Sequence, residues 1–200
     1  MSDRTMQDSI NIMSSKNSEL FAAIDQQDVP LLIQILAAGA DPNAVSSLDN
    51  NALHEACDSW HEPEKRFQMV QALLDAGADP TIIDKDGGGP LFAAVIAKDT
   101  RVIELLLSRG ADPNKEHDLG ETLYDWSEFD YRFDEYDLNL PEEPTEADKA
   151  TEEAWLEFLS KLALKYGKRS PDYLIALRRA GAMTGCEKWK APGTSSPHDS

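Results

Sequence analysis

Cysteine is scarce in this chain, which has only Cys57 and Cys186. Two cysteines cannot build the disulfide framework of a small secreted protein, so we expect a reduced, cytoplasmic protein. Long apolar runs are also missing. No stretch approaches the roughly 18 apolar residues of a membrane span, and no apolar run follows Arg4. We therefore expect neither a signal peptide nor a membrane as partner.

Basic residues are few as well. The 200 residues include 19 Lys and Arg against 37 Asp and Glu, which gives a formal net charge of −18. Such a field repels nucleic acids and anionic membrane surfaces. It either favours a partner protein with a basic surface or serves only to keep the protein in solution. The charge is concentrated, because residues 118–157 hold 15 acidic residues and two basic ones, a local net of 2 − 15 = −13.

What the chain does contain is a repeat. The phrase Ala38-Gly-Ala-Asp-Pro-Asn43 returns as Ala76-Gly-Ala-Asp-Pro-Thr81 and as Arg109-Gly-Ala-Asp-Pro-Asn114, with a weaker fourth copy at Ala180-Gly-Ala-Met183. The gaps between successive glycines are 38, 33 and 71 residues. A period of 33 is typical of stacked helix pairs, and the two longer gaps indicate insertions of 5 and 38 residues.

A second phrase repeats in phase with the first. Its copies begin at Ser18, Asn51, Gly89 and Thr122, and each opens a short helical pattern such as Gly89-Pro-Leu-Phe-Ala-Ala94. An apolar stripe follows at helical spacing, as in Val102, Ile103 and Leu106. The glycine after each second helix supplies a positive φ at the helix end.

These two phrases resemble those of the ankyrin repeat family, over residues 18–127 and 170–183. The resemblance implies an all-α solenoid of about four helix-turn-helix repeats with β-hairpin-like finger loops and an extra helix inserted in the last repeat. We expect repeats at about 17–45, 46–83, 84–116 and 117–183, with the acidic and helical insertion at 128–168. Residues 1–16 and 184–200 are expected to be flexible.

The insertion interleaves aromatic and acidic residues, such as Trp126, Phe129, Tyr131, Phe133 and Tyr136 among Asp and Glu. A capping pattern, Thr145-Glu-Ala-Asp148, predicts a helix of about 18 residues ending near Gly167. Two interpretations stay open. In one, the extra helix caps the solenoid and the carboxylates are its solvated face. In the other, the acidic–aromatic segment is a docking surface for a basic partner.

Ankyrin arrays bind proteins through their fingers and the exposed face of their first helices, and the resemblance carries that surface onto this chain. The alternative for each position is ordinary solvated surface. The predicted partner-binding residues are Leu48, Asn50, Glu55, Asp58, Trp60, Lys85, Asp86, Gly88, Asp118, Leu119, Glu121, Trp126 and Phe129.

The sequence gives little indication of catalysis or metal binding. No nucleophile and base stand in a recognisable motif, and Gly87-Gly-Gly89 lacks the Lys and Ser/Thr of a phosphate loop. We expect no cofactor, no metal and no enzyme activity. The alternative function is an enzyme or metal protein that uses His54, Cys57 and His61. The favoured function is a protein-binding module, a monomer when unbound, that binds a basic partner. Its specific form, by analogy, is an inhibitor or immunity protein, and the sequence leaves open whether binding inhibits or scaffolds.

Overall fold

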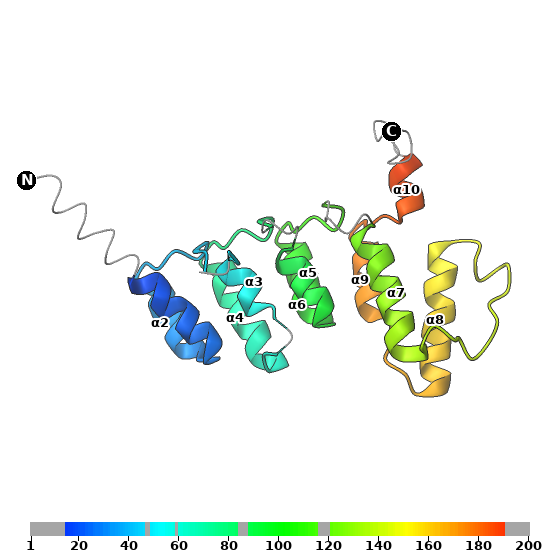
Figure 1. The fold of residues 1–200 in the computed structure, drawn as a ribbon, viewed down its shortest axis with the longest axis horizontal. Helices are drawn as coiled ribbons and strands as arrows, with labels where there is room; N and C mark the ends of the chain where they lie inside the picture. The colour runs from blue at the N-terminus through cyan, green and yellow to red at the C-terminus, as the bar shows by residue number, and fades with distance from the viewer. Residues whose placement is uncertain (1–14, 47–48, 59, 84–87, 116–120, 191–200) are drawn as a thin grey trace, which may run out of the picture. The chain divides into compact units, whose positions relative to one another are not determined.

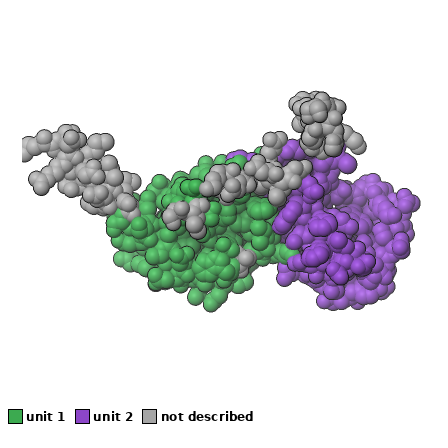
Figure 2. Space-filling view, viewed as in Figure 1, with its two compact units in different colours: residues 1–112 green, residues 113–200 purple. Residues whose placement is uncertain are grey.

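The structure is a computed structural model that describes residues 15–46, 49–58, 60–83, 88–115 and 121–190. It divides into two compact units, residues 1–112 and residues 113–200, which Figure 2 shows in green and purple. Each unit is described by itself below.

Unit 1 consists of helix pairs (Figure 1). A helix over residues 15–25 is followed by α2 (Val29–Ala37), α3 (Ala52–Ala56), α4 (Pro63–Asp75), α5 (Pro90–Ile96) and α6 (Thr100–Ser108). The second helices of successive pairs pack on one another, α2 on α4 and α4 on α6, while the first helices α3 and α5 are also neighbours. The apolar stripe of each helix is therefore buried by the next pair, which one pair alone cannot do. Fully buried residues of this core include Leu32, Leu53, Leu73, Ile103 and Leu106.

The second helices end in one recurring turn. Gly39, Gly77, Gly110 and Gly181 all have φ between 88° and 98°, where a side chain is disfavoured. At each of them the next backbone N–H reaches back to a carbonyl five residues earlier, as from Ala111 to Leu106 at 3.0 Å. This pattern is the Schellman motif, and it confirms the predicted positive φ even at the degenerate fourth copy.

Arg66 fixes the longer loop that the five-residue insertion gives the second repeat. It is a core residue that the sequence analysis did not single out. Its guanidinium donates to the carbonyl oxygens of Asp58 and His61, at 3.0 and 2.8 Å, within the loop before α4. The same group forms a buried ion pair with Asp99, Nη1 to Oδ2 at 2.9 Å. Asp99 in turn accepts from the Val102 N–H as the N-cap of α6. One cation thus ties the longer loop of one repeat to the helix start of the next.

Unit 2 contains a long helix pair and the inserted helix. Its helices are α7 (Leu123–Tyr136), α8 (Glu152–Tyr166), α9 (Asp172–Arg179) and α10 (Gly185–Lys190). Helix α7 packs on α9, and the connection between them carries α8 (Figure 1). Tyr124, Tyr131, Tyr173 and Leu159 are among the fully buried side chains of this unit.

The inserted helix starts later than predicted. Thr145 and Asp148 do form reciprocal hydrogen bonds, with the Thr145 N–H donating to Asp148 at 2.8 Å, but only a turn follows. Thr151 supplies a second cap, accepting from the Ala154 N–H at 3.1 Å, and α8 begins at Glu152 with 15 residues. Its end is as predicted, because Gly167 adopts φ 63° and terminates the helix.

The described residues confirm the predicted all-α class, a solenoid of helix pairs with an extra helix in the last repeat. They contain no strand, although an isolated antiparallel bridge joins Val45 to Asn51 in the first finger. The predicted repeat boundaries remain predictions. Helix α7 runs without a break through residue 128, where we expected the insertion to begin.

Candidate partner-binding surface

In unit 1, three of the predicted binding residues lie close to one another along α3 and the loop that follows. The Asn50 amide donates to the Glu55 carboxylate at 3.3 Å, and Ser46 donates to the same oxygen at 3.2 Å. Trp60 is 52% exposed and its ring lies 3.8 Å from that of His61, whose Nε2 is 2.8 Å from the Glu55 carbonyl oxygen. The finger, the first helix and the longer loop therefore present one polar and aromatic patch.

Other predicted residues lie outside the described part of the chain, namely Leu48, Lys85, Asp86, Asp118 and Leu119. Gly88 and Asp58 are half-buried, and the Asp58 carbonyl is already bound by Arg66. These positions remain predictions.

In unit 2, the exposed face of α7 carries an aromatic row, defined here as Trp126, Phe129 and Phe133. Their spacing of three and four residues places them on one side of the helix. Phe129 is 49% exposed and Phe133 is 51% exposed, while Trp126 is half-buried. Glu121, just before the helix, is exposed. Sequence reasoning placed Phe133 in the insertion without including it in the site, although its i+4 spacing from Phe129 would have found it.

The remaining aromatic residues of α7 face inward. Tyr131 is buried, and its hydroxyl donates to the Arg169 carbonyl at 2.7 Å. Tyr173 of α9 is buried as well and donates to the Ser127 carbonyl at 3.2 Å. Burial raises the pKa of both tyrosines far above the usual range. The aromatic residues of the insertion are thus divided between core and surface, and the docking interpretation stays a prediction.

Carboxylates flank the aromatic row on both sides. Asp130 is half-buried and Asp134 is exposed on one side. On the other side Glu128 accepts from the Trp155 indole at 2.9 Å and pairs with Arg132 at 2.6 Å. Helix α8 is therefore fastened to α7 by a hydrogen bond at the edge of the exposed row.

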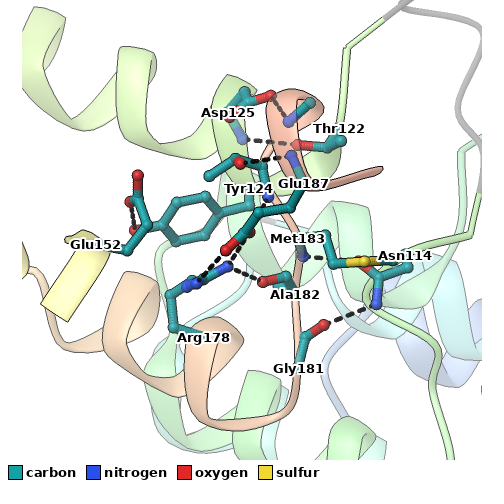
Figure 3. A network of polar contacts seen from close by, with 12 residues as sticks. Asn114, Thr122, Tyr124, Asp125, Glu152, Arg178, Gly181, Ala182, Met183 and Glu187 are labelled. Atoms are coloured by element: carbon teal, nitrogen blue, oxygen red, sulfur yellow. Dashed lines mark hydrogen bonds and ion pairs between the residues drawn. The ribbon is translucent and has the colours of Figure 1, made fainter. Parts of the chain in front are cut away.

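A polar network fixes the short helix α10 in unit 2 (Figure 3). Arg178 makes two hydrogen bonds to the Glu187 carboxylate, at 2.6 and 3.0 Å, and its guanidinium lies 5.3 Å from the centre of the Tyr124 ring. The bond from Arg178 lowers the pKa of Glu187 to about 2. Tyr124 donates to Glu152 at 3.1 Å, and burial raises the pKa of that carboxyl group.

The possible metal cluster gains no support from the geometry. Within the described part of the chain, no three His, Cys, Asp or Glu side chains converge in a way that could hold a metal ion. Cys57 is fully buried, and burial raises the pKa of its thiol far above the usual range, so the neutral thiol is the stable form. His61 is also buried, and burial lowers its pKa.

An apolar hollow of about 700 Å³ lies elsewhere in unit 1, between α2 and α4. Ile33, Leu36 and Phe67 are among its lining residues, and Ile33 is exposed. The second helices build this hollow, whereas the resemblance pointed to fingers and first helices.

No helix in the described residues combines the length and the apolar character that crossing a membrane requires.

Comparison with known proteins agrees with the repeat geometry. A family model described as ankyrin repeats, in three copies, matches residues 20–117. An ankyrin repeat protein of Acanthamoeba polyphaga mimivirus is 30% identical over 105 residues, which cover 52% of this chain and 13% of that protein. Protein PhlB of Serratia liquefaciens is 33% identical over 89 residues (42% and 39%), and the mitochondrial disaggregase of Bos taurus is 29% identical over 150 residues (57% and 21%).

The chain spans less than two fifths of the length of each of these three relatives. What they share with it is the repeated helix pair and its glycine turn. Ankyrin repeats are protein–protein interaction modules, and by these repeats the chain belongs to the ankyrin repeat family.

Proposed function

We propose that this protein is a non-catalytic binding module that recognises a partner protein with a basic surface, and that it is a monomer when unbound. By analogy, a fitting role is that of an inhibitor or immunity protein that covers the basic site of its target. The aromatic row of α7 is the observation that carries the proposal.

Exposed aromatic side chains with flanking carboxylates suit the centre of a protein interface. Phe129 and Phe133 each leave about half of their surface to solvent. Burying the remainder against a partner contributes about 1 kcal/mol for each ring, since full burial of a Phe side chain is worth roughly 1.5–3 kcal/mol. Aromatic residues are enriched at interface centres, where contacts are desolvated.

The charge supports a basic partner. Residues 118–157 carry a net charge of 2 − 15 = −13, and Asp130 and Asp134 stand beside the aromatic row. Carboxylates around an apolar centre accelerate the encounter with a positively charged surface, and salt weakens that steering. The Asn50, Glu55 and Trp60 patch of unit 1 is the second surface that we assign to partner binding.

The test begins by identifying the partner and then uses it in purified form. Proteins captured at low salt are identified by mass spectrometry, and the affinity of the purified partner is measured by calorimetry. We expect Phe129→Ser with Phe133→Ser to weaken binding about 10- to 1,000-fold, as for central anchors. Leu164→Ser is the matched control, because Leu164 is 88% exposed on α8, away from the row.

Charge reversal separates steering from contact. Asp130→Lys with Asp134→Lys is expected to slow association and to flatten its dependence on salt, whereas Glu143→Lys, at an exposed carboxylate of the α7–α8 connection, has a smaller effect. Affinity that survives both the double serine variant and the double lysine variant would show that α7 is not the binding surface.

A further inference from the structure

An open hollow of about 600 Å³ lies in unit 2 beside the carboxyl ends of α7 and α8. Its walls combine aromatic rings, carboxylates and one ammonium group, from Phe133, Asp134, Tyr136, Asp137, Tyr166 and Lys168. Phe133 belongs to the aromatic row, so the hollow continues the candidate surface of α7.

The electrostatics of the hollow favour a cation. The last carbonyl groups of a helix carry partial negative charge, and here two helices end beside the same space. Asp137 is the C-cap of α7, with φ 50° and ψ 39°. Within the described chain, its carboxylate makes neither a hydrogen bond nor an ion pair. A full negative charge therefore stands without a direct ion pair where two helix dipoles add to it, although the Lys168 ammonium lines the same hollow.

The protein already holds its own cations near these rings. The Lys168 Nζ lies 5.8 Å from the centre of the Tyr136 ring, and the Lys165 Nζ lies 5.5 Å from that of Tyr166. Lys165 is fixed by an ion pair with Glu142 at 2.5 Å, but Lys168 has no ion pair among the described residues. An exposed cation–π contact is worth only about 0.5–1 kcal/mol, so a better cation can displace Lys168.

Tyr136 contributes its ring to the wall of the hollow. The residue is 7% exposed, and the Lys168 ammonium lies over its ring. Its hydroxyl is buried and interacts with that of Tyr131, so the ring, rather than the oxygen, is what a cation in the hollow would contact.

We propose that this hollow accepts one arginine side chain of the partner in place of Lys168. The inference deepens the proposed function and rests on it for its biological setting. A guanidinium group stacks on aromatic rings and donates several hydrogen bonds at once, which matches the rings and the Asp137 carboxylate better than an ammonium does.

The experiment uses the full chain, labelled with ¹⁵N, and the tripeptide acetyl-Gly-Arg-Gly-amide. The control peptide carries citrulline, the neutral analogue of arginine with the same shape. We expect the arginine peptide to cause saturable shifts in the amide signals of residues 133–139 and 166–168, with a Kd on the order of 1–10 mM, typical of one exposed side-chain contact. The citrulline peptide is expected to cause none.

Two variants test the residues that we name. Asp137→Asn keeps the left-handed backbone, which Asn tolerates, and is expected to weaken binding at least about fivefold by removing the charge. Lys168→Met is expected to strengthen binding about two- to fivefold by removing the competing cation. Glu143→Gln, an exposed carboxylate that does not line the hollow, is the matched control and is expected to change nothing.

Equal shifts from the citrulline peptide, shifts spread evenly over all acidic surfaces, or no saturation by about 50 mM peptide would overturn the inference. So would an Asp137→Asn variant with unchanged binding. Because the peptide is measured without the partner, peptide binding with no basic partner protein would refute the proposed function alone. If the partner binds the Asp137→Asn variant with unchanged affinity, only the role of the hollow is refuted.

Discussion

The side-chain amide of Asn114 clamps the backbone of Gly181, donating to its carbonyl oxygen at 2.8 Å and accepting from the N–H of Met183 at 2.8 Å. Asn43 makes the same pair of contacts, to Gly77 at 3.3 Å and to Asp79 at 2.7 Å. The two clamps close loops of 67 and 34 residues, which differ by 67 − 34 = 33. The inserted segment is therefore looped out without altering the contact between turns. Figure 3 shows the contacts of Asn114 with Gly181 and Met183.

We expect Asn114→Ala to lower the free energy of unfolding by about 1–3 kcal/mol, since two hydrogen bonds to backbone groups, one exposed and one partly buried, are lost. Asn43→Ala is the matched variant in unit 1 and is expected to cost a similar amount. Asn114→Asp keeps the acceptor for Met183 but loses the donor to Gly181, so its loss is expected to be smaller. Urea denaturation followed by circular dichroism measures all three, and wild-type stability in Asn114→Ala would contradict the clamp.

The stability of the fold is expected to depend on the ion pair of Arg66 with Asp99, because both charged groups are buried. Arg66→Met leaves the buried Asp99 carboxylate with only the more distant Arg101 Nε, at 3.8 Å, and removing one partner of a buried pair typically costs about 3–5 kcal/mol. Asp99→Asn retains a cap for α6 while removing the negative charge. We therefore expect the double variant Arg66→Met with Asp99→Asn to be more stable than Arg66→Met alone, as judged by thermal denaturation. A double variant that is less stable than the single one would contradict this account.

The ion pair of Glu187 with Arg178 is expected to keep helix α10 in place even at low pH. Since the pKa of this carboxyl is lowered to about 2 in the folded protein from its usual 4.5, its stabilising contribution is complete above pH 4.5. It is lost as the pH falls from 4.5 through 2. The amide signals of residues 184–188 are expected to follow this window in NMR spectra, while Glu187→Gln shows no such transition. A midpoint near 4.5 in the native chain would show that Arg178 does not hold the carboxylate.

His61 should make the stability depend on pH in the same direction, but closer to neutral pH. Its Nε2 donates to the Glu55 carbonyl, while the buried Nδ1 has no hydrogen-bond partner among the described residues. Burial lowers the pKa of His61 below its usual 6.5, so the unfolded chain takes up a proton before the folded one does. The contribution of neutral His61 is complete above pH 6.5 and is lost as the pH falls below it. We expect the native protein to lose more stability between pH 7 and 5 than His61→Gln in parallel denaturation curves, and equal losses would refute this.

Much of the fold was predictable because its signals are local. The glycine turns at Gly39, Gly77 and Gly110 need a positive φ, and the phrase around each of them repeats with the helical stripes. The fourth turn at Gly181 could be placed by the same phrase despite the insertion. The inserted helix was found with its end at Gly167 but not its start, because two threonines, Thr145 and Thr151, both offer caps and sequence alone does not rank them.

The candidate site was predictable only in part. Residue types and spacing determined that α7 carries aromatic and acidic side chains, and Phe129 and Trp126 do lie on its outer face. Helical periodicity alone did not assign Tyr131 and Tyr136 to the interior, since that depends on where α8 and α9 pack.

The sequence by itself determined the repeated helix pair, its glycine turns and the concentration of negative charge, since each follows from residues close together in the chain. Only the tertiary structure decided that Arg66 is buried against Asp99, that Asn114 reaches Gly181, and that Phe133, Asp137 and Lys168 share one hollow. Arg66 and Asp99, Asn114 and Gly181, and Lys168 and each of Phe133 and Asp137 are more than thirty positions apart, where packing and desolvation, rather than local conformational preference, select the partner.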